Sequence, residues 1–481
     1  MSNAEGESTL RIRPLRRIAF LLPPTGAFCR EDRCQSRFRF ELIPSMRAPL
    51  EECEAAGAII AAGGQACIVD APAEGLGNEA VLNRLRNFAP DLVVLVVTFG
   101  SLSADLGWAK LLREALPDVV VGVRGAPAFT HAEKILASSP DVTFVARGEY
   151  EIIFTEIVRK GLPASGTLVR FGEDIVSGGA PPQAECLDRL PLPDRSTLNP
   201  ELYRVRGLGV PQATVRVQRG CPFPCTYCLV HTVSGNQSRH RSPEAVAEEI
   251  ASLVEQGTNY FYLRAETFSV DRQWSIETSR AIGALAPKAR WVTTTRVDCV
   301  DDGVIRAMAS GGCYGVSFGI DVGSEEIGRR VKKRPDLAKA QRAMRLCDAF
   351  GLLSLGYFMI GFAWETPSTL DETARFCRAT RPDLLTLHFA HPYPGTPYSE
   401  DISEIEGLQR SPRHTDHAQA RPALQTAELS LMDLEKAAAG MRRRHYADPR
   451  VLLSIARKGA RIALHSATAQ ARVSLRTGES N

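Results

Sequence analysis

Three cysteines are clustered in the stretch Val217-Gln-Arg-Gly-Cys221-Pro-Phe-Pro-Cys225-Thr-Tyr227-Cys228. They have C-x3-C-x2-C spacing and lie on a loop with Pro and Gly, directly after a predicted strand at residues 213–218. Three thiolates on such a loop can bind three irons of a four-iron cluster and leave the fourth iron open to another ligand. We therefore interpret Cys221, Cys225 and Cys228 as ligands of a 4Fe-4S cluster.

A zinc site is the alternative interpretation of this loop. His231 lies three residues after Cys228 and could complete a set of three thiolates and one imidazole. Against zinc, such sites usually take a second ligand pair from a distant segment, and this spacing is not that of ordinary zinc fingers. The other cysteines lie singly and are interpreted as small buried hydrophobes: Cys29, Cys34, Cys53, Cys67, Cys186, Cys299, Cys313, Cys347 and Cys377.

The composition is that of a globular protein of two or three domains. Of 481 residues, 44% are hydrophobic and 23% are charged, with 58 basic against 55 acidic side chains. This balance gives no reason to expect a nucleic-acid partner. Apolar runs such as residues 92–97 are far shorter than the roughly 18 residues of a membrane span, and the first 15 residues do not have the pattern of a signal peptide. We expect a cytoplasmic protein whose thiols stay reduced.

The alternation of strand and helix patterns divides the chain into four parts. Residues 1–160 predict a doubly wound, Rossmann-like α/β domain, with strands at 18–22, 66–69, 92–97, 119–123 and 142–146. Residues 161–210 are rich in Pro and Gly and predict a linker. Residues 211–400 contain six βα units and predict a partial (β/α)6 barrel, with strands at 213–218, 260–263, 291–294, 315–318, 353–360 and 384–389. A helical region is expected over residues 401–481.

Polar side chains follow three strands of the predicted barrel. Glu266 comes after the second strand, Arg296 and Asp298 after the third, and Asp321 after the fourth. The carboxyl ends of parallel barrel strands form the active face, so these side chains are candidates for binding a ligand. For any one of these acids, a helix N-cap or a surface ion pair is the alternative.

The cysteine loop resembles the C-x3-C-x-aromatic-C motif of the radical S-adenosylmethionine (SAM) superfamily. This resemblance implies that the amino and carboxylate groups of SAM chelate the open iron. It also implies that the reduced cluster cleaves SAM to methionine and a 5′-deoxyadenosyl radical, with an electron donor such as flavodoxin or ferredoxin. Tyr227 is then expected against the adenine, and the remaining SAM contacts are assigned to Glu266, Arg296, Asp298 and Asp321.

Three further segments, 318–324, 356–366 and 392–396, are similar to strand-end motifs of the cobalamin-binding branch of that superfamily. In the first of them, Asp321 and Val322 stand where the branch usually has Glu and Ser. The resemblance covers roughly residues 16–400 and includes the order of the domains.

The turn after the second strand of the first domain has the sequence Asp70-Ala-Pro72-Ala-Glu-Gly75. It is similar to the Asp-x-His-x-x-Gly turn of cobalamin domains, whose His coordinates cobalt, but Pro72 has no nitrogen lone pair to offer. The domain has therefore either lost cobalamin or binds it without an axial ligand from this turn, as the cobalamin-binding radical SAM family commonly does. We favour binding, because Arg47 and Pro49 and a set of residues at the ligand-binding edge of the predicted sheet support it: Asp70, Pro72, Gly75, Thr98, Ser101, Gly122, Gly125, Gly148 and Glu149.

The resemblance implies methylation of an unactivated carbon of a small molecule or lipid. A radical cyclisation or rearrangement like that of the anaerobic porphyrin ring cyclase is one alternative, and a non-catalytic cobalamin or zinc sensor is another. Methylthiotransferases have a similar layout but need three widely spaced cysteines in the first domain, and the cysteines there lack that spacing. The basic stretches at 441–445 and 450–465 predict a helix packed on the barrel or, alternatively, a membrane-surface contact.

Overall fold

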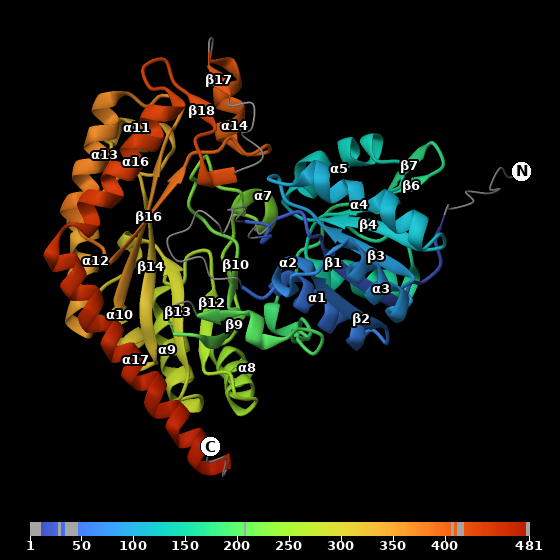
Figure 1. The fold of residues 1–481 in the computed structure, drawn as a ribbon, viewed down its shortest axis with the longest axis horizontal. Helices are drawn as coiled ribbons and strands as arrows, with labels where there is room; N and C mark the ends of the chain where they lie inside the picture. The colour runs from blue at the N-terminus through green and yellow to red at the C-terminus, as the bar shows by residue number, and fades with distance from the viewer. Residues whose placement is uncertain are drawn as a thin grey trace, which may run out of the picture. The chain divides into compact units, whose positions relative to one another are not determined.

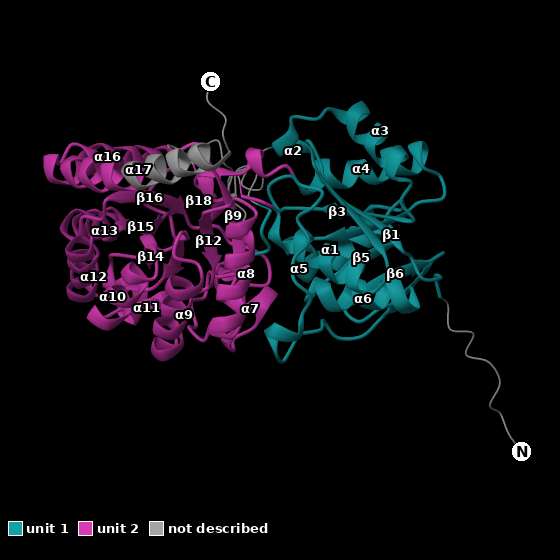
Figure 2. Ribbon diagram, turned by 90° about the horizontal axis from the view of Figure 1, so that it is seen from below, with its two compact units in different colours: residues 1–35, 49–198 teal, residues 36–48, 199–481 magenta. Residues whose placement is uncertain are grey.

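The structure is a computed structural model that describes residues 11–26, 30–33, 47–205, 208–405, 408–410 and 418–477. The chain divides into two compact units (Figure 2). Unit 1 contains Met1–Gln35 and Pro49–Leu198, and unit 2 contains Ser36–Ala48 and Asn199–Asn481.

Unit 1 is built on a seven-stranded sheet with the order β2-β1-β3-β4-β5-β6-β7. Strands β1 to β5 are parallel, whereas β6 and β7 are antiparallel to their neighbours. The strands are β1 (Arg17–Leu22), β2 (Gln65–Asp70), β3 (Leu92–Val96), β4 (Val120–Arg124), β5 (Phe144–Ala146), β6 (Thr167–Phe171) and β7 (Asp174–Ser177).

Helices cover both faces of this sheet, because the central strands are apolar on both sides. Leu92, Val94 and Val96 of β3 belong to one hydrophobic cluster, together with residues of α1 (Leu50–Ala61) and α6 (Tyr150–Lys160). Val93 and Leu95 belong to a second cluster, with residues of α3 (Asn78–Phe88), α4 (Leu102–Ala115) and α5 (Ala126–Ser138). Unit 1 is therefore doubly wound, which confirms the predicted fold class.

The Pro- and Gly-rich segment 161–210, predicted as a linker, contains two strands of the unit 1 sheet. These strands, β6 and β7, form an antiparallel hairpin. The chain after them stays against the unit, since the Asp194 amide donates to the Cys53 carbonyl at 2.9 Å and the Ile68 amide to Thr197 Oγ1 at 3.2 Å. The edge strand β7 is mostly exposed, so it has no apolar periodicity from which it could be predicted.

Unit 2 contains a second seven-stranded sheet, with the order β16-β15-β14-β13-β12-β9-β8 (Figure 1). Six of its strands are parallel and form the predicted partial barrel, while β8 (Arg204–Val205) pairs antiparallel at the edge. The parallel strands are β9 (Val210–Arg216), β12 (Tyr260–Arg264), β13 (Arg290–Thr295), β14 (Cys313–Asp321), β15 (Leu353–Ile360) and β16 (Leu384–Phe389). They alternate with α8 (Pro243–Glu255), α9 (Arg272–Leu285), α10 (Asp302–Ser310), α12 (Leu337–Phe350) and α13 (Pro367–Thr380).

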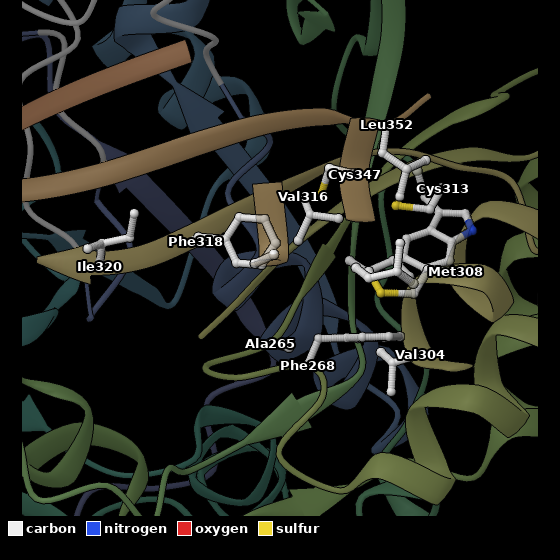
Figure 3. Packing of buried hydrophobic residues seen from close by; sticks show 14 of the residues in the cluster. Ala265, Phe268, Val304, Met308, Cys313, Val316, Phe318, Ile320, Cys347 and Leu352 are labelled. Carbon is white, nitrogen blue, oxygen red and sulfur yellow. The ribbon is translucent and has the colours of Figure 1, made fainter. Parts of the chain in front are cut away.

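Alternate residues of β14 face opposite sides of the sheet. Val316, Phe318 and Ile320 are buried in the cluster that the sheet forms with the helices, and Figure 3 shows them following one another along the strand. Gly319 and Asp321 alternate with them and therefore face the other, concave side. The strand thus delivers Asp321 to the concave face at its carboxyl end.

The C-terminal part of unit 2 contains α14 (Pro397–Asp401), the paired strands β17 (Gln409–Arg410) and β18 (Leu424–Gln425), and the helices α16 (Leu431–Tyr446) and α17 (Pro449–Thr477). Ser430 caps α16 in a capping box with Asp433. No helix in the described ranges is both long enough and apolar enough to cross a membrane.

Candidate functional site

The cysteine loop follows β9 and β10 (Gln218–Arg219) at the carboxyl end of the barrel strands. Its entry requires a glycine: Gly220 has φ of 81°, and a Cβ there would lie 2.0 Å from the Gln237 carbonyl oxygen. The Cys221 amide donates to the Gly235 carbonyl at 3.3 Å, and the Thr226 amide donates to the Val331 carbonyl at 3.1 Å. Backbone contacts therefore fix the loop on both sides.

A buried amide side chain joins the loop to the next strand. Gln218 Nε2 donates to the Gly220 carbonyl at 3.2 Å, and Gln218 Oε1 accepts from the Thr267 amide at 3.1 Å. The Thr267 hydroxyl in turn lies 3.7 Å from Cys221 Sγ. Gln218 thereby sets the cysteine loop against the segment that follows β12.

The three cysteines are partly buried. Burial raises the pKa of the Cys228 thiol to about 12 and raises the pKa of the Cys225 thiol above its usual value. Thiolates in such a place need nearby positive charge, which bound iron supplies. The donor set of three thiolates on a rigid loop therefore fits a cluster with one open iron.

His231 contacts the backbone of the loop. Its Nε2 lies 2.8 Å from the Cys221 carbonyl oxygen. Within the part of the chain that the structure describes, no three His, Cys, Asp or Glu side chains surround a point that could hold one metal ion. The sulfurs of a cluster each bind a different iron and so stand farther apart than the ligands of a single zinc.

Tyr227, between the last two cysteines, is tied to the end of β14. Its hydroxyl donates to Asp321 Oδ2 at 2.7 Å, and its ring packs edge-on against Phe362 with ring centres 5.7 Å apart. Lys333 Nζ lies 2.8 Å from the same carboxylate oxygen of Asp321. Asp321 adopts a positive φ of 64°, which is costly for a residue other than glycine, so a built environment holds it in place.

Arg296 and Asp298 form a two-bond ion pair beside the loop. The distances are 2.8 Å from Arg296 Nε to Asp298 Oδ1 and 2.7 Å from Nη2 to Oδ2. Burial disfavours the charge of Asp298, but Arg296 outweighs this effect and holds the pKa of the carboxyl below its usual value. The guanidinium also lies 3.9 Å above the Phe223 ring, and its Nη1 lies 3.8 Å from Cys225 Sγ.

Glu266 differs from these acids. Both carboxylate oxygens are buried, and neither has a hydrogen-bond partner among the described residues. A buried carboxylate without a partner is costly, and a cationic ligand would remove that cost. Glu266 directly precedes Thr267, the residue whose hydroxyl lies 3.7 Å from Cys221 Sγ.

In unit 1, the turn after β2 forms the short helix α2 (Ala71–Glu74). Asp70 caps it by accepting from the Ala73 amide at 3.1 Å, Pro72 lies in its first turn, and Gly75 ends it with φ of 67°. A Cβ on Gly75 would meet nothing within 4 Å. The turn therefore has a local structural basis and leaves open space at Gly75.

Thr98 and Ser101, after β3, belong to a buried polar network. The Thr98 amide and the Ser101 hydroxyl donate to Asp105 Oδ2 at 3.2 and 2.7 Å, and Arg30 pairs with the same carboxylate at 2.8 Å. Glu149, after β5, accepts from the Ala184 amide at 2.7 Å. Asp70, Thr98, Ser101 and Glu149 lie at carboxyl ends of parallel strands, the edge where doubly wound sheets bind ligands.

The glycines assigned to this edge have packing roles. Gly122 lies inside β4, and a Cβ there would meet the Phe144 ring at 2.4 Å. A Cβ on Gly125 would lie 2.1 Å from the Val97 carbonyl oxygen, and one on Gly148 would lie 2.6 Å from Pro182. Internal close approach is thus sufficient reason for glycine at these three positions.

Arg47, which the sequence analysis took as support for cobalamin binding, precedes α1 in the chain. It belongs to the segment assigned to unit 2, where its guanidinium lies 3.9 Å above the Tyr262 ring of β12. Pro49 is the N-cap residue of α1. Cys53 and Cys67 of unit 1 are buried among hydrophobic side chains, whereas Cys29 and Cys34 lie outside the described residues. Cys186 is exposed, so the expectation of a buried thiol was wrong at that position.

Residues 215–377, which contain the cysteine loop, match the model of the Radical SAM superfamily. The chain is 30% identical over 337 residues to an uncharacterized methyltransferase of Pyrococcus horikoshii, covering 68% of this chain and 73% of that relative. The chain belongs to the radical SAM superfamily. It is also 27% identical to the anaerobic magnesium-protoporphyrin IX monomethyl ester cyclase of Cereibacter sphaeroides, over 70% of this chain and 57% of the cyclase.

A solved structure with a cobalamin domain and a radical SAM domain has a fold similar to that of this chain. The radical SAM methyltransferase TsrM from Kitasatospora setae, solved with cobalamin and a [4Fe-4S] cluster bound, matches with a TM-score of 0.64 and 18% identity. The match covers 82% of this chain and 81% of TsrM. The likeness establishes a shared fold.

Two polar residues of this radical SAM site were not found from the sequence. Gln218 lies at the end of a strand, and only its burial with no exposed surface distinguishes it from an ordinary surface amide. Lys333 lies in the basic stretch Arg329–Arg334, where any residue could have been a surface charge. Nothing in the sequence marked either Gln218 or Lys333.

Proposed function

We propose that the chain is a cobalamin-dependent radical SAM methyltransferase that methylates an unactivated carbon of a small molecule or lipid. The proposal depends above all on one arrangement: Cys221 of the three-cysteine loop lies 3.7 Å from the hydroxyl of Thr267, and Thr267 directly follows Glu266, whose buried carboxylate has no partner among the described residues. The arrangement supplies three thiolates for a cluster and an acid for the ammonium group of SAM.

The chemistry that such a cluster and cobalamin supply together is the reductive cleavage of SAM to a 5′-deoxyadenosyl radical and the delivery of a methyl group. The residues of this chain bind the cluster and SAM and orient them. Cys221, Cys225 and Cys228 hold the cluster, and Glu266 accepts the ammonium of SAM. We assign the adenine contact to Tyr227, whose hydroxyl donates to Asp321.

Support for cobalamin comes from unit 1 and from the fold shared with TsrM. The strand order β2-β1-β3-β4-β5 places the carboxyl ends of five parallel strands along one edge. We assign the contacts to Asp70, Gly75, Thr98, Ser101 and Glu149 along that edge, with Pro72 offering no ligand to cobalt. Gly122, Gly125 and Gly148 contribute by letting the backbone pack closely.

The first test is the iron content of anaerobically reconstituted protein. The wild type should hold about four irons per chain, and replacing Cys221, Cys225 and Cys228 together with Ala should abolish both the iron and the cleavage of SAM. Cys186→Ala, which removes an exposed thiol, is the matched control and should change neither. One tightly bound zinc without iron uptake would contradict the proposal.

A radical cyclase is the second candidate function, favoured by the similarity to the magnesium-protoporphyrin cyclase. The products of SAM distinguish the two. A methyltransferase should form S-adenosylhomocysteine in step with methylated product, whereas a cyclase should form 5′-deoxyadenosine alone. A low-potential donor such as flavodoxin or ferredoxin is the proposed source of electrons, and dithionite can replace it in the assay.

A further inference from the structure

We propose that Arg296 is a positioning residue that raises the reduction potential of the cluster by donating an N–H···S hydrogen bond to the Cys225 thiolate. The inference rests on the proposed function, because it requires a cluster on the three cysteines. It reassigns Arg296, which the sequence placed among the residues that bind SAM.

The guanidinium is held on three sides. Asp298 accepts hydrogen bonds from Nε and Nη2 of Arg296 at 2.8 and 2.7 Å. The remaining nitrogen of the guanidinium, Nη1, faces Cys225 Sγ at 3.8 Å. Phe223, which lies between Cys221 and Cys225 in the loop, packs 3.9 Å beneath the guanidinium. Because this ring belongs to the cysteine loop itself, the guanidinium is fixed relative to the sulfur.

Hydrogen bonds to the sulfurs are one of the factors that set the potential of an iron-sulfur cluster. Reduction brings one electron from the donor into the cluster and breaks no bond, so the thiolate sulfurs become more negative. A charged N–H donor stabilises the reduced form more than the oxidised form. The contact between Arg296 and Cys225 is partly buried, so solvent screens it less than a contact at the open surface.

The role of Asp298 follows from the same geometry. The Asp298 carboxylate orients the guanidinium of Arg296. Its negative charge also offsets part of the guanidinium's positive charge as felt by more distant groups. The effect on the cluster therefore comes from the direct Nη1 contact. Lys333, the other cation near Cys225, is paired with Asp321 at 2.8 Å and donates to the Gly319 carbonyl at 2.8 Å. Arg296, by contrast, has a nitrogen within hydrogen-bond range of a cluster sulfur.

The test is a redox titration of reconstituted protein without SAM, followed by the electron paramagnetic resonance signal of the reduced cluster. Arg296→Gln should lower the equilibrium constant for reduction about tenfold, which is about 59 mV for one electron. Its iron content should match the wild type. Arg272→Gln is the matched control, because Arg272 pairs with Asp301 at 2.6 Å on the surface and should leave the potential unchanged.

A second variant keeps the test decisive if Arg296→Gln takes up no iron. Arg296→Lys keeps a positive charge at this position but lacks the planar fork that lets two nitrogens bind Asp298 while a third faces Cys225, so the potential should fall. Full iron with an unshifted potential in Arg296→Gln, or in Arg296→Lys where the first variant holds no iron, would overturn the inference. A wild type without a cluster would instead overturn the proposed function.

Discussion

Glu266 is the side chain for which the structure leaves the clearest place for a ligand. Its oxygens are buried without a partner in the described part of the chain. A charge-assisted contact to the SAM ammonium is worth on the order of 1.5 to 3 kcal/mol. We expect Glu266→Gln to bind SAM about ten- to a hundredfold more weakly and to form 5′-deoxyadenosine more slowly, measured by equilibrium binding and product analysis under anaerobic conditions.

The iron and cobalamin content of Glu266→Gln should stay near that of the wild type. Glu277→Gln is the control, since Glu277 is an exposed carboxylate on α9 that accepts from Gln273 at 2.6 Å. Unchanged SAM affinity in Glu266→Gln would mean that another acid, Asp298 or Asp321, holds the ammonium.

The sequence predicted single residues well where their chemistry depends on spacing along the chain. Cys221, Cys225 and Cys228 come from one loop, and the position of Glu266 follows from the end of one strand. It could not predict that Arg296 and Asp298 pair with each other, or that Lys333 reaches Asp321. The first pair depends on the local path of the chain after β13, and the second on how the end of β14 meets the segment after α11 (Glu325–Arg330).

The turn between β15 and α13 is closed by a buried carboxylate, Glu365. Its Oε2 accepts from the amides of Gly361 and Phe362, the latter at 3.3 Å. Burial nevertheless raises the pKa of Glu365 from 4.5 to about 7. Because the folded state then binds a proton that the unfolded state has lost, this residue makes stability fall as the pH rises from about 4.5 to about 7.

Replacing Glu365 with Gln should remove this dependence, since Gln keeps an acceptor for both amides and stays neutral. One pKa unit corresponds to about 1.4 kcal/mol, so the wild type should lose up to about 3 kcal/mol across that range relative to the variant. Urea unfolding at pH 5 and pH 7.5 measures the difference. If the free energy of unfolding changes equally with pH in the wild type and in Glu365→Gln, Glu365 stays charged throughout this range.

The elements with strong periodicity were predicted closely. The ranges 353–360 and 384–389 coincide with β15 and β16, because each is a run of apolar residues that the barrel buries. The hairpin β6–β7 was missed, since its second strand is exposed and its turn contains Gly172 with φ of 63°. Local composition suggested a linker, and only pairing with β5 shows a sheet edge.

The C-terminal tail shows how a basic stretch can serve the fold of the whole unit. Lys458 of α17 is 1% exposed, and its Nζ lies 2.7 Å from Asp383 Oδ2. Asp383 directly precedes β16 and also accepts from the Ser354 amide and hydroxyl of β15 at 2.8 and 2.9 Å. The tail is therefore attached at the amino ends of the barrel strands, opposite to the cysteine loop, as the prediction of a helix packed on the barrel requires.

We expect Lys458→Met to release α17, because it leaves Asp383 buried without its cation. Breaking a buried pair in this way costs on the order of 3 kcal/mol, and the Ser354 bonds to Asp383 keep the cost at the lower end of the usual range. Hydrogen exchange of the α17 amides should be faster in the variant, and its melting temperature should be lower.

Lys458→Met with Asp383→Asn should recover part of the loss, since no unpaired charge remains. Lys110→Met, at an exposed pair with Glu114, should change neither measurement. If α17 exchanges as slowly in Lys458→Met as in the wild type, apolar packing against the barrel holds the helix, and the buried ion pair is dispensable.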